Sequence, residues 1–347
     1  MYIKRILLII VLAGLVAAGI FSYYIYKTVF LPNTAFENET AFVFVSSERS
    51  YADVRSQLKP LLNDIESFDK VAQKKGYVQN IRPGKYQIKK GMNNNDIVNS
   101  LRSRNIPIRI SFNNQETLER LAGRVSEQIE ADSISLLKTM KDEAYLSTNG
   151  FNPETALAMY IPNTYEFYWN SSAETFRNRM LTEYNNFWNE SRRAKAEALN
   201  MSPLQVMSLA AIVQKETAMA DERPRVAGVY LNRLRIGMLL QADPTVIFAI
   251  KKETGDFDTI IKRVLFKDLE IDSPYNTYKY PGVPPGPIAM PDISSIDAVL
   301  NPEKHDYLYF VADVSNPGYH IFGKTLAQHN RNRQQYINWI NRQGVRR

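Results

Sequence analysis

The stretch that decides the fold is Ser202-Pro-Leu-Gln-Val-Met-Ser-Leu-Ala-Ala-Ile-Val-Gln-Lys-Glu-Thr217. Ser202 and Gln205 fit a capping box, and the proline between them occupies the first helical position, where no N–H is needed. From Leu204 to Val213 the predicted helix is apolar on nearly all sides. A helix of this kind is buried all round. We therefore predict a central helix within a folded domain.

The carboxyl group near the end of this helix, that of Glu216, lies on its apolar side. Glu216 follows Ile212 by four residues and Val213 by three, so it continues the buried stripe. Burial raises the pKa of a carboxyl group and keeps it protonated near neutrality, as a general acid requires. The alternative is a glutamate that pairs with Arg223 or Arg225. Position alone does not decide between the two interpretations.

Downstream segments have the composition of a carbohydrate site. Residues 222–235 predict a second helix that ends before Gly237. The segments 238–245, 273–278 and 282–291 are rich in Tyr, Asn, Thr, Gln, Pro and Gly. Such loops offer stacking faces and amide or hydroxyl partners on a rigid frame. This mixture suits a sugar polymer better than a phosphate or a hydride donor.

At the N-terminus, residues 6–25 carry no charge and follow Lys4 and Arg5. At about 1.5 Å per residue, such a helix matches the roughly 30 Å hydrocarbon core of a bilayer. The alternative is a cleaved signal peptide, for which residues 17–19 offer small side chains. However, the apolar run is longer than a signal peptide needs and ends in tyrosines typical of a membrane interface. We predict an uncleaved anchor with a cytoplasmic N-terminus, because the flanking charges follow the positive-inside rule.

The chain between the anchor and the central helix predicts an α+β organisation. Strand, helix, helix, strand and helix follow one another within residues 41–112. The segment Gly84-Lys-Tyr-Gln-Ile-Lys-Lys-Gly91 resembles the glycan-binding LysM module, although a packing role for Tyr86 and Ile88 is the simpler interpretation. The predicted divisions are a cytoplasmic end (1–5), a transmembrane helix (6–26), a connector (27–40), a LysM-like α+β subdomain (41–112) and a larger, mainly helical domain with short strands (113–347).

Charge and composition limit the chemistry. The 347 residues include 43 Lys and Arg, 36 Asp and Glu, and no cysteine, so disulfides, thiolate metal sites and a cysteine nucleophile are excluded. Eight basic residues lie at the two ends, which leaves 35 basic against 36 acidic residues in the body of the chain, and no nucleic acid partner is indicated. These eight are Lys4, Arg5, Lys27, Arg331, Arg333, Arg342, Arg346 and Arg347. The histidines at 305, 320 and 329 fit no metal-ligand spacing, and we predict neither metal nor cofactor.

Together these segments resemble the endolytic murein transglycosylases, the MltG/YceG-like family. The matching segments are 161–165, 212–217, 222–224, 226–234, 237–238, 240–246, 273–278, 284–289, 300–302, 307–313 and 329–330. The resemblance implies a single-pass protein of the cell inner (cytoplasmic) membrane, with its catalytic domain on the extracytoplasmic side. Gln214 departs from the family, in which the position two before the catalytic glutamate is often acidic.

The resemblance also implies a reaction. Nascent peptidoglycan strands would be cleaved at the β-1,4 bond between N-acetylmuramic acid and N-acetylglucosamine, leaving a 1,6-anhydromuramic end without use of water. The family's catalytic glutamate, in the Lys-Glu-Thr motif, corresponds to Glu216, which would act first as acid and then as base. Peptidoglycan strands, the membrane and peptidoglycan synthases are the implied partners.

Several residues near Glu216 are expected to line the glycan groove. They are Gln241, Asp243, Thr245, Tyr275, Asn276 and Tyr278. A hydrolase would need a second carboxylate, and Asp243 and Asp313 are the candidates, although a helix or turn cap at Asp243 and a structural role after a strand at Asp313 are simpler. Two other functions stay open: a muramidase-type hydrolase that uses Glu216 with Asp243, and a non-catalytic glycan-binding scaffold.

Overall fold

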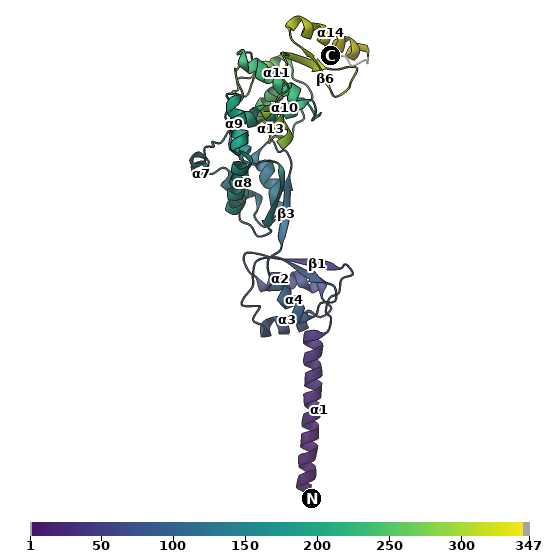
Figure 1. Ribbon diagram of the computed structural model, residues 1–347. Coiled ribbons are helices and arrows are strands. Elements are labelled where there is room, and N and C mark those ends of the chain that lie inside the picture. Colours follow the sequence, from purple (N-terminus) through teal and green to yellow (C-terminus); the bar gives the residue numbers. More distant parts are fainter. Residues whose placement is uncertain (1, 343–347) are drawn as a thin grey trace. The chain divides into compact units, whose positions relative to one another are not determined.

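The computed structural model describes residues 2–342, so predictions for Met1 and for 343–347, Arg346 and Arg347 among them, lie outside the described residues. The chain divides into two compact units. Unit 1 comprises the chain up to Ile110 together with 128–131 and 165–172, and unit 2 comprises 111–127, 132–164 and the chain from Ala173. Helices and short strands alternate in both (Figure 1), which confirms the predicted α+β class.

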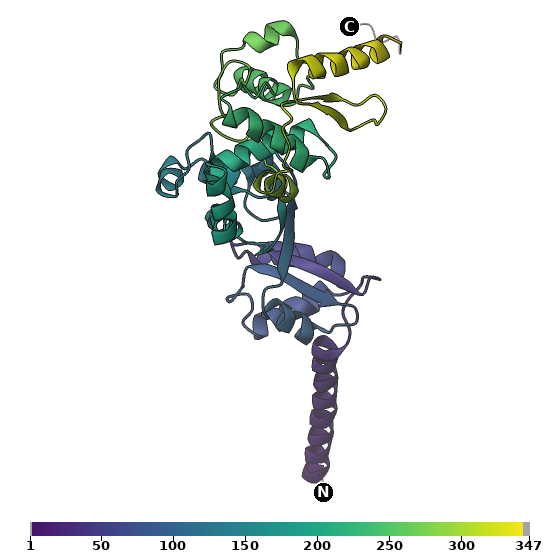
Figure 2. The same cartoon turned by 45° about the horizontal axis from the view of Figure 1, so that its top comes forward.

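Helix α1 (Tyr2–Phe30) is one continuous helix that includes the predicted span and the start of the predicted connector (Figures 1 and 2). Its mean hydropathy reaches 2.6 over 18 residues, none of which is buried. Within residues 2–342 it is the one straight helix long and apolar enough to cross a membrane. The pair α9 (Glu190–Ala198) and α10 (Pro203–Glu216), bent by 77°, passes the same test, but α10 is buried in unit 2. Helix α1 is therefore consistent with a membrane anchor.

Beyond α1, unit 1 has the predicted order of elements. They are β1 (Thr40–Val45), α2 (Tyr51–Leu58), the 3-10 helix η1 (Lys59–Leu61), α3 (Ile65–Lys74), β2 (Gly84–Lys89) and α4 (Asn94–Leu101). Strands β1 and β2 pair antiparallel, from Thr40 opposite Lys89 to Val45 opposite Gly84. Tyr86 and Ile88 are buried in the core of this unit, as expected for a packing role. The likeness to LysM stays a prediction.

Unit 2 is mainly helical. Its elements are α5 (Leu118–Ser126), α6 (Ser133–Met140), α7 (Glu143–Thr148), η2 (Ala156–Met159), α8 (Ala173–Phe187), α9, α10, α11 (Arg223–Arg235), α12 (Asp243–Thr254), η3 (Phe266–Glu270), α13 (Ile293–Leu300), β5 (Tyr309–Ala312), β6 (His320–Gly323) and α14 (Leu326–Arg342). Strands β5 and β6 form an antiparallel pair beside α14 (Figure 2). Strands β3 (Pro107–Phe112) and β4 (Asn163–Tyr168) also pair, and the boundary between the units falls within each of them.

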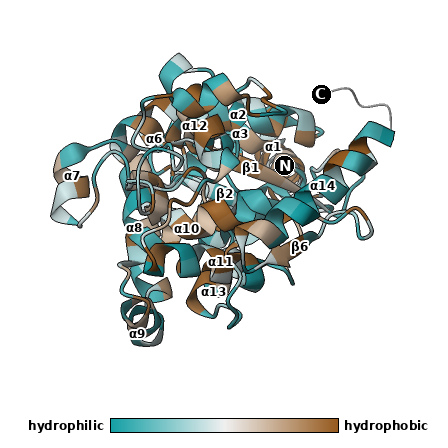
Figure 3. Cartoon of the chain, turned by 90° about the horizontal axis from the view of Figure 1, so that it is seen from above, coloured by the Kyte–Doolittle hydropathy of each residue, from teal (hydrophilic) through white to brown (hydrophobic). Residues whose placement is uncertain are grey.

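Helix α10 is the central helix that the sequence predicts. The capping box between Ser202 and Gln205 is present, and every residue from Val206 to Val213 is buried. Helices α11, α12 and α13 pack around it, and Figure 3 shows apolar, brown segments of ribbon in α10 and α13. Burial of each large apolar side chain stabilises the fold by about 1.5–3 kcal/mol, so this helix fixes the frame from which Glu216 projects.

Candidate active site

Glu216 is the last residue of α10, and its carboxyl group contacts α11. The hydroxyl of Tyr230 donates a hydrogen bond to Oε1 of Glu216 at 2.8 Å. Burial raises the pKa of Glu216 to about 7; the Tyr230 hydrogen bond and the positive charge of Arg233 oppose this rise, and the negative charge of Asp243 adds to it. The residue as a whole keeps intermediate exposure. A carboxyl group that is both desolvated and reachable can exchange a proton with a substrate near neutral pH.

The two arginines that could have neutralised Glu216 bind other groups. Arg223 donates to Oγ of Ser294 at 2.7 Å, and Arg225 forms an ion pair with Glu303 at 3.0 Å. Glu216 itself has a neutral phenol as its hydrogen-bond partner. These contacts therefore do not support the alternative interpretation, in which Glu216 pairs with Arg223 or Arg225.

Helix α11 supplies two site residues, Tyr230 and Arg233, that were not among those predicted from the sequence. Arg233 donates to the backbone oxygens of Leu240, at 2.5 Å, and of Leu308, at 2.7 Å. These bonds fix a buried cation one turn after Tyr230. A signal was present, because Val226, Tyr230 and Arg233 share one helix face by their spacing. The same rule that selected Glu216 on α10 would have selected both polar residues here.

Asp243 and Tyr278 form a second polar pair near Glu216. The hydroxyl of Tyr278 donates to Oδ1 of Asp243 at 2.5 Å. Asp243 is exposed and is the first residue of α12, whose N-cap is Ala242, so Asp243 is not the cap of this helix. Its charge nevertheless raises the pKa of Glu216, which places the two carboxyl groups in one electrostatic environment.

Three of the residues expected to line a groove are buried instead. Thr245 and Asn276 are 0% exposed, and Tyr275 is 2% exposed. The Thr245 hydroxyl lies 2.8 Å from that of Thr277, and Asn276 donates to the backbone oxygens of Leu269 and Ile271. Their polar atoms thus hold the loops around the site in place. We assign them positioning roles.

Tyr275 connects the same loop to a distant segment of unit 2. Its hydroxyl donates to Glu154 at 2.7 Å, and its ring packs against Phe248 with centroids 4.7 Å apart. A Cβ at Gly286 would come within 1.9 Å of the backbone oxygen of Glu154, so only glycine fits there. Gln241, in contrast, is exposed and adopts a positive φ of 50°, one residue before the N-cap of α12. Its side chain remains available to a ligand.

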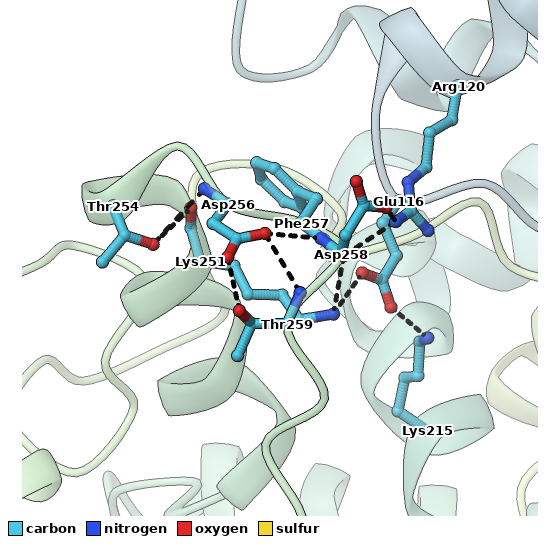
Figure 4. Close-up of polar contacts among 9 residues, drawn as sticks. All are labelled: Glu116, Arg120, Lys215, Lys251, Thr254, Asp256, Phe257, Asp258 and Thr259. Atoms are coloured by element: carbon cyan, nitrogen blue, oxygen red, sulfur yellow. Dashed lines mark hydrogen bonds and ion pairs between the residues drawn. The ribbon is translucent and has the colours of Figure 1, made fainter.

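A second glutamate, Glu116, lies in the segment between β3 and α5 and contacts the last turn of α10 through Lys215 (Figure 4). Its environment is very different from that of Glu216. The carboxylate of Glu116 accepts from Lys215 at 2.7 Å and from Lys251 at 2.9 Å. Burial alone would raise the pKa of Glu116, but these two ammonium groups outweigh burial and hold it below its usual range. Because Lys215 lies on α10 and Lys251 on α12, this cluster ties together the helices that carry Glu216 and Asp243.

Two further polar residues have structural contacts. Gln214, which departs from the family pattern, accepts at Oε1 from the backbone N–H of Asp292 at 2.5 Å, directly before α13. Asp313 accepts from the backbone N–H of Ser315 at 2.8 Å and from its hydroxyl at 2.6 Å, in the turn after β5. Asp313 therefore serves its own turn, as the simpler interpretation holds.

The chain is similar to several known proteins of one family. The sequence matches the YceG-like family over residues 43–335. It is 31% identical over 343 residues to the endolytic murein transglycosylase of Bacillus subtilis, covering 93% of this chain and 91% of that protein. It is 26% identical to the endolytic murein transglycosylase of Streptococcus pneumoniae serotype 2, over 95% of this chain and 64% of that protein. A solved yceG-like protein of Listeria monocytogenes has a TM-score of 0.56 and 30% identity, covering 85% of this chain and 99% of its own.

Proposed function

We propose that this chain, which belongs to the YceG-like family, is a membrane-anchored endolytic murein transglycosylase. It cleaves nascent peptidoglycan strands at the β-1,4 bond between N-acetylmuramic acid and N-acetylglucosamine. One observation carries the proposal: the carboxyl group of Glu216 is buried, which raises its pKa to about 7, and it accepts its hydrogen bond from an uncharged phenol at 2.8 Å. Its relatives in Bacillus subtilis and Streptococcus pneumoniae are endolytic murein transglycosylases, which supports the same reaction.

Glu216 performs both proton transfers. Tyr230 donates to Oε1, so the other oxygen, Oε2, carries the proton. That proton passes to the glycosidic oxygen as the bond to C1 of the muramic residue breaks, and positive charge develops at the ring. The Glu216 carboxylate then takes the proton of the C6 hydroxyl, whose oxygen closes onto C1. Glu216 ends protonated again, and no water is consumed.

The remaining site residues orient this carboxyl group and the glycan. Tyr230 fixes the orientation of Glu216, and Arg233 limits how far its pKa rises. Gln241, Asp243 and Tyr278 lie on accessible surface, and we assign contacts with the glycan to them. Thr245, Tyr275 and Asn276 hold the loops that present these residues.

Helix α1 supplies the anchor in this proposal. The catalytic unit then lies on the extracytoplasmic side of the inner membrane, because Lys4 and Arg5 precede the span. This is also the side on which nascent glycan is assembled, so peptidoglycan synthases are the partners we expect.

A muramidase-type hydrolase is the second candidate, because the charge of Asp243 acts on Glu216. Such an enzyme would use Asp243 to activate water or to attack C1. The two reactions leave different ends: the lytic product carries an anhydromuramic end, one water lighter than a reducing end.

The test is digestion of uncrosslinked glycan strands by the full chain in detergent, followed by mass spectrometry of the new ends. Anhydromuramic ends support the proposal, and reducing muramic ends contradict it. The variant Glu216→Gln should bind glycan without cutting it, while the matched control Glu253→Gln, at an exposed glutamate on α12, should cut normally. Binding without cleavage by the unmodified chain would indicate a scaffold.

A further inference from the structure

A groove of about 580 Å³ lies between α1 and α3 in unit 1. Apolar side chains and three lysines line it, and one of these lysines, Lys75, donates to Asn95 and Asn99. The apolar residues that carry the argument are Phe21, Ile25, Val29 and Val71, and the lysines are Lys70 and Lys74. Neither the proton transfers at Glu216 nor the glycan contacts use this groove, which belongs to the other unit.

The position of the groove along α1 corresponds to a membrane interface. Its lining runs from Phe21 to Val29 on that helix, a rise of about 12 Å at 1.5 Å per residue. Because the uncharged run ends at Tyr26, the first half of the groove lies at the edge of the hydrocarbon core. The second half lies in the headgroup region, which is about 5–7 Å deep on each side.

The rim of the groove presents positive charge at the level of Tyr24, near the end of the uncharged run of α1. Lys70 donates to the hydroxyl of Tyr24 at 2.8 Å, and its ammonium group lies 5.4 Å from the centroid of that ring. Lys74, one turn later on α3, is exposed. The acidic residues of the same helix are directed elsewhere, since Glu66 and Asp69 both pair with Arg55, at 3.5 and 2.7 Å. The rim therefore suits an anion.

The groove is held in shape by buried amides. Asn94 donates to the backbone oxygen of Thr28 at 2.7 Å, and Asn33 donates to Oδ1 of Asn94 at 2.7 Å and to the backbone oxygen of Asp64 at 2.8 Å. Asn33 and Asn94 are 5% and 1% exposed. The segment predicted as a polar connector is thus built into the fold, and the end of α1 is fixed to α3 and α4. A preformed groove binds a ligand without the cost of ordering its walls.

We propose that this groove holds one anionic phospholipid of the leaflet in which α1 ends. An acyl chain lies along Phe21 and Ile25, and the phosphate lies at Lys70 and Lys74. An amphipathic lipid matches the lining, which combines apolar side chains with lysines. The proposal rests on membrane anchoring by α1, which is part of the proposed function.

The test uses the full chain in mild detergent, offered equal amounts of phosphatidylglycerol and phosphatidylcholine with the same acyl chains. Native mass spectrometry then counts each bound lipid. We expect the unmodified chain to retain phosphatidylglycerol preferentially. In the double variant Lys70→Gln with Lys74→Gln, the affinity for phosphatidylglycerol should fall by about fivefold for each of the two lysines removed. The matched control, Arg104→Gln with Arg109→Gln, removes two exposed cations of unit 1 outside the groove and should bind as the unmodified chain does.

Equal binding of the two lipids by the unmodified chain would overturn the proposal, as would the same loss in the control. Dimers without bound lipid would also overturn it, because a second α1 would then occupy the groove. Insertion into phosphatidylglycerol vesicles, scored by resistance to a carbonate wash, separates failure of the proposed membrane anchoring from failure of the proposed lipid binding. A chain that washes off has failed as an anchored protein, whereas an inserted chain without lipid preference has failed only as a lipid-binding one.

Discussion

Glu216, the last residue of α10, and Glu116, which contacts Lys215 of the same helix, have opposite environments. Glu116 is held by Lys215 and Lys251, and its pKa lies below the usual range. Glu216 receives a hydrogen bond from a phenol, feels the charge of Asp243, and has a pKa of about 7. Burial acts in the same direction on both. Burial raises the pKa of a carboxyl group, and the charge of its partners decides whether that rise survives: two ammonium groups cancel it at Glu116, whereas an uncharged phenol leaves most of it at Glu216.

The largest difference between the two glutamates is expected in activity. Glu216→Gln keeps an oxygen to accept from Tyr230 but removes the transferable proton. We expect cleavage to fall by about 10²–10⁴-fold, the usual contribution of a positioned general acid. The measurement is release of new glycan ends over time. Comparable losses in Glu116→Gln and Glu216→Gln would erase the distinction, because Glu116 has no role in proton transfer here.

The next effect concerns the stability of Glu216→Gln as a function of pH. An unfolded glutamate ionises near pH 4.5, whereas Glu216 stays protonated to about 7, so the native chain loses stability as pH rises through that window. The variant lacks this loss. Its free energy of unfolding relative to the unmodified chain should therefore improve by about 3 kcal/mol from pH 4 to pH 8.

Thermal unfolding of the full chain in detergent across this pH range measures the difference. The control Glu253→Gln, at an exposed position, should show a constant offset. A variant that runs parallel to the unmodified chain at every pH would mean that Glu216 is ionised like an ordinary surface glutamate.

Glu116→Gln should show the opposite pH dependence. The pKa of Glu116 is depressed, so its ion pairs stabilise the fold above the unfolded pKa, and this stabilisation is lost as pH falls through the lower folded value. We expect the variant to be less stable by about 2 kcal/mol at neutral pH. The penalty should disappear in acid. The same pH series of unfolding experiments measures it, and a penalty that persists in acid would show that packing, not charge, is lost.

The smallest effects are shifts in the pH dependence of kcat/KM. Tyr230→Phe removes a hydrogen bond that lowers the pKa of Glu216, so the loss of activity at high pH should move upward. Asp243→Asn removes a charge that raises this pKa, so the same loss should move downward. Each shift is expected to be about one pH unit or less. Tyr280→Phe, at an exposed tyrosine, is the control, and shifts of equal sign in the two site variants would contradict the assignment.

The sequence predicts those parts of the fold that depend on local pattern. The capping box and apolar run of α10, the β1 to α4 order of unit 1 and the apolar segment within α1 all follow from residues close together in the chain. The contact between Tyr230 and Glu216 does not, because it joins two helices whose relative packing no local pattern specifies. Even so, Tyr230 and Arg233 could have been selected by their place on the buried face of α11.

Polar loop residues were the least predictable part of the site. Thr245 and Asn276 are of the types that bind sugars, yet both satisfy groups of their own loops. Composition cannot separate these roles, because an amide or hydroxyl that closes a loop and one that faces a ligand are the same chemical group. The family match over residues 43–335 constrains the reaction class but not these individual roles.

The central claim is that Glu216 alone carries the proton through cleavage and that water takes no part. Digestion of glycan strands in water enriched in oxygen-18, followed by mass spectrometry of the new muramic ends, tests it directly. Proton transfer by Glu216 alone predicts anhydromuramic ends with no oxygen-18. One oxygen-18 atom at each new muramic end would show that water attacked C1, and would contradict the lytic reaction in favour of hydrolysis.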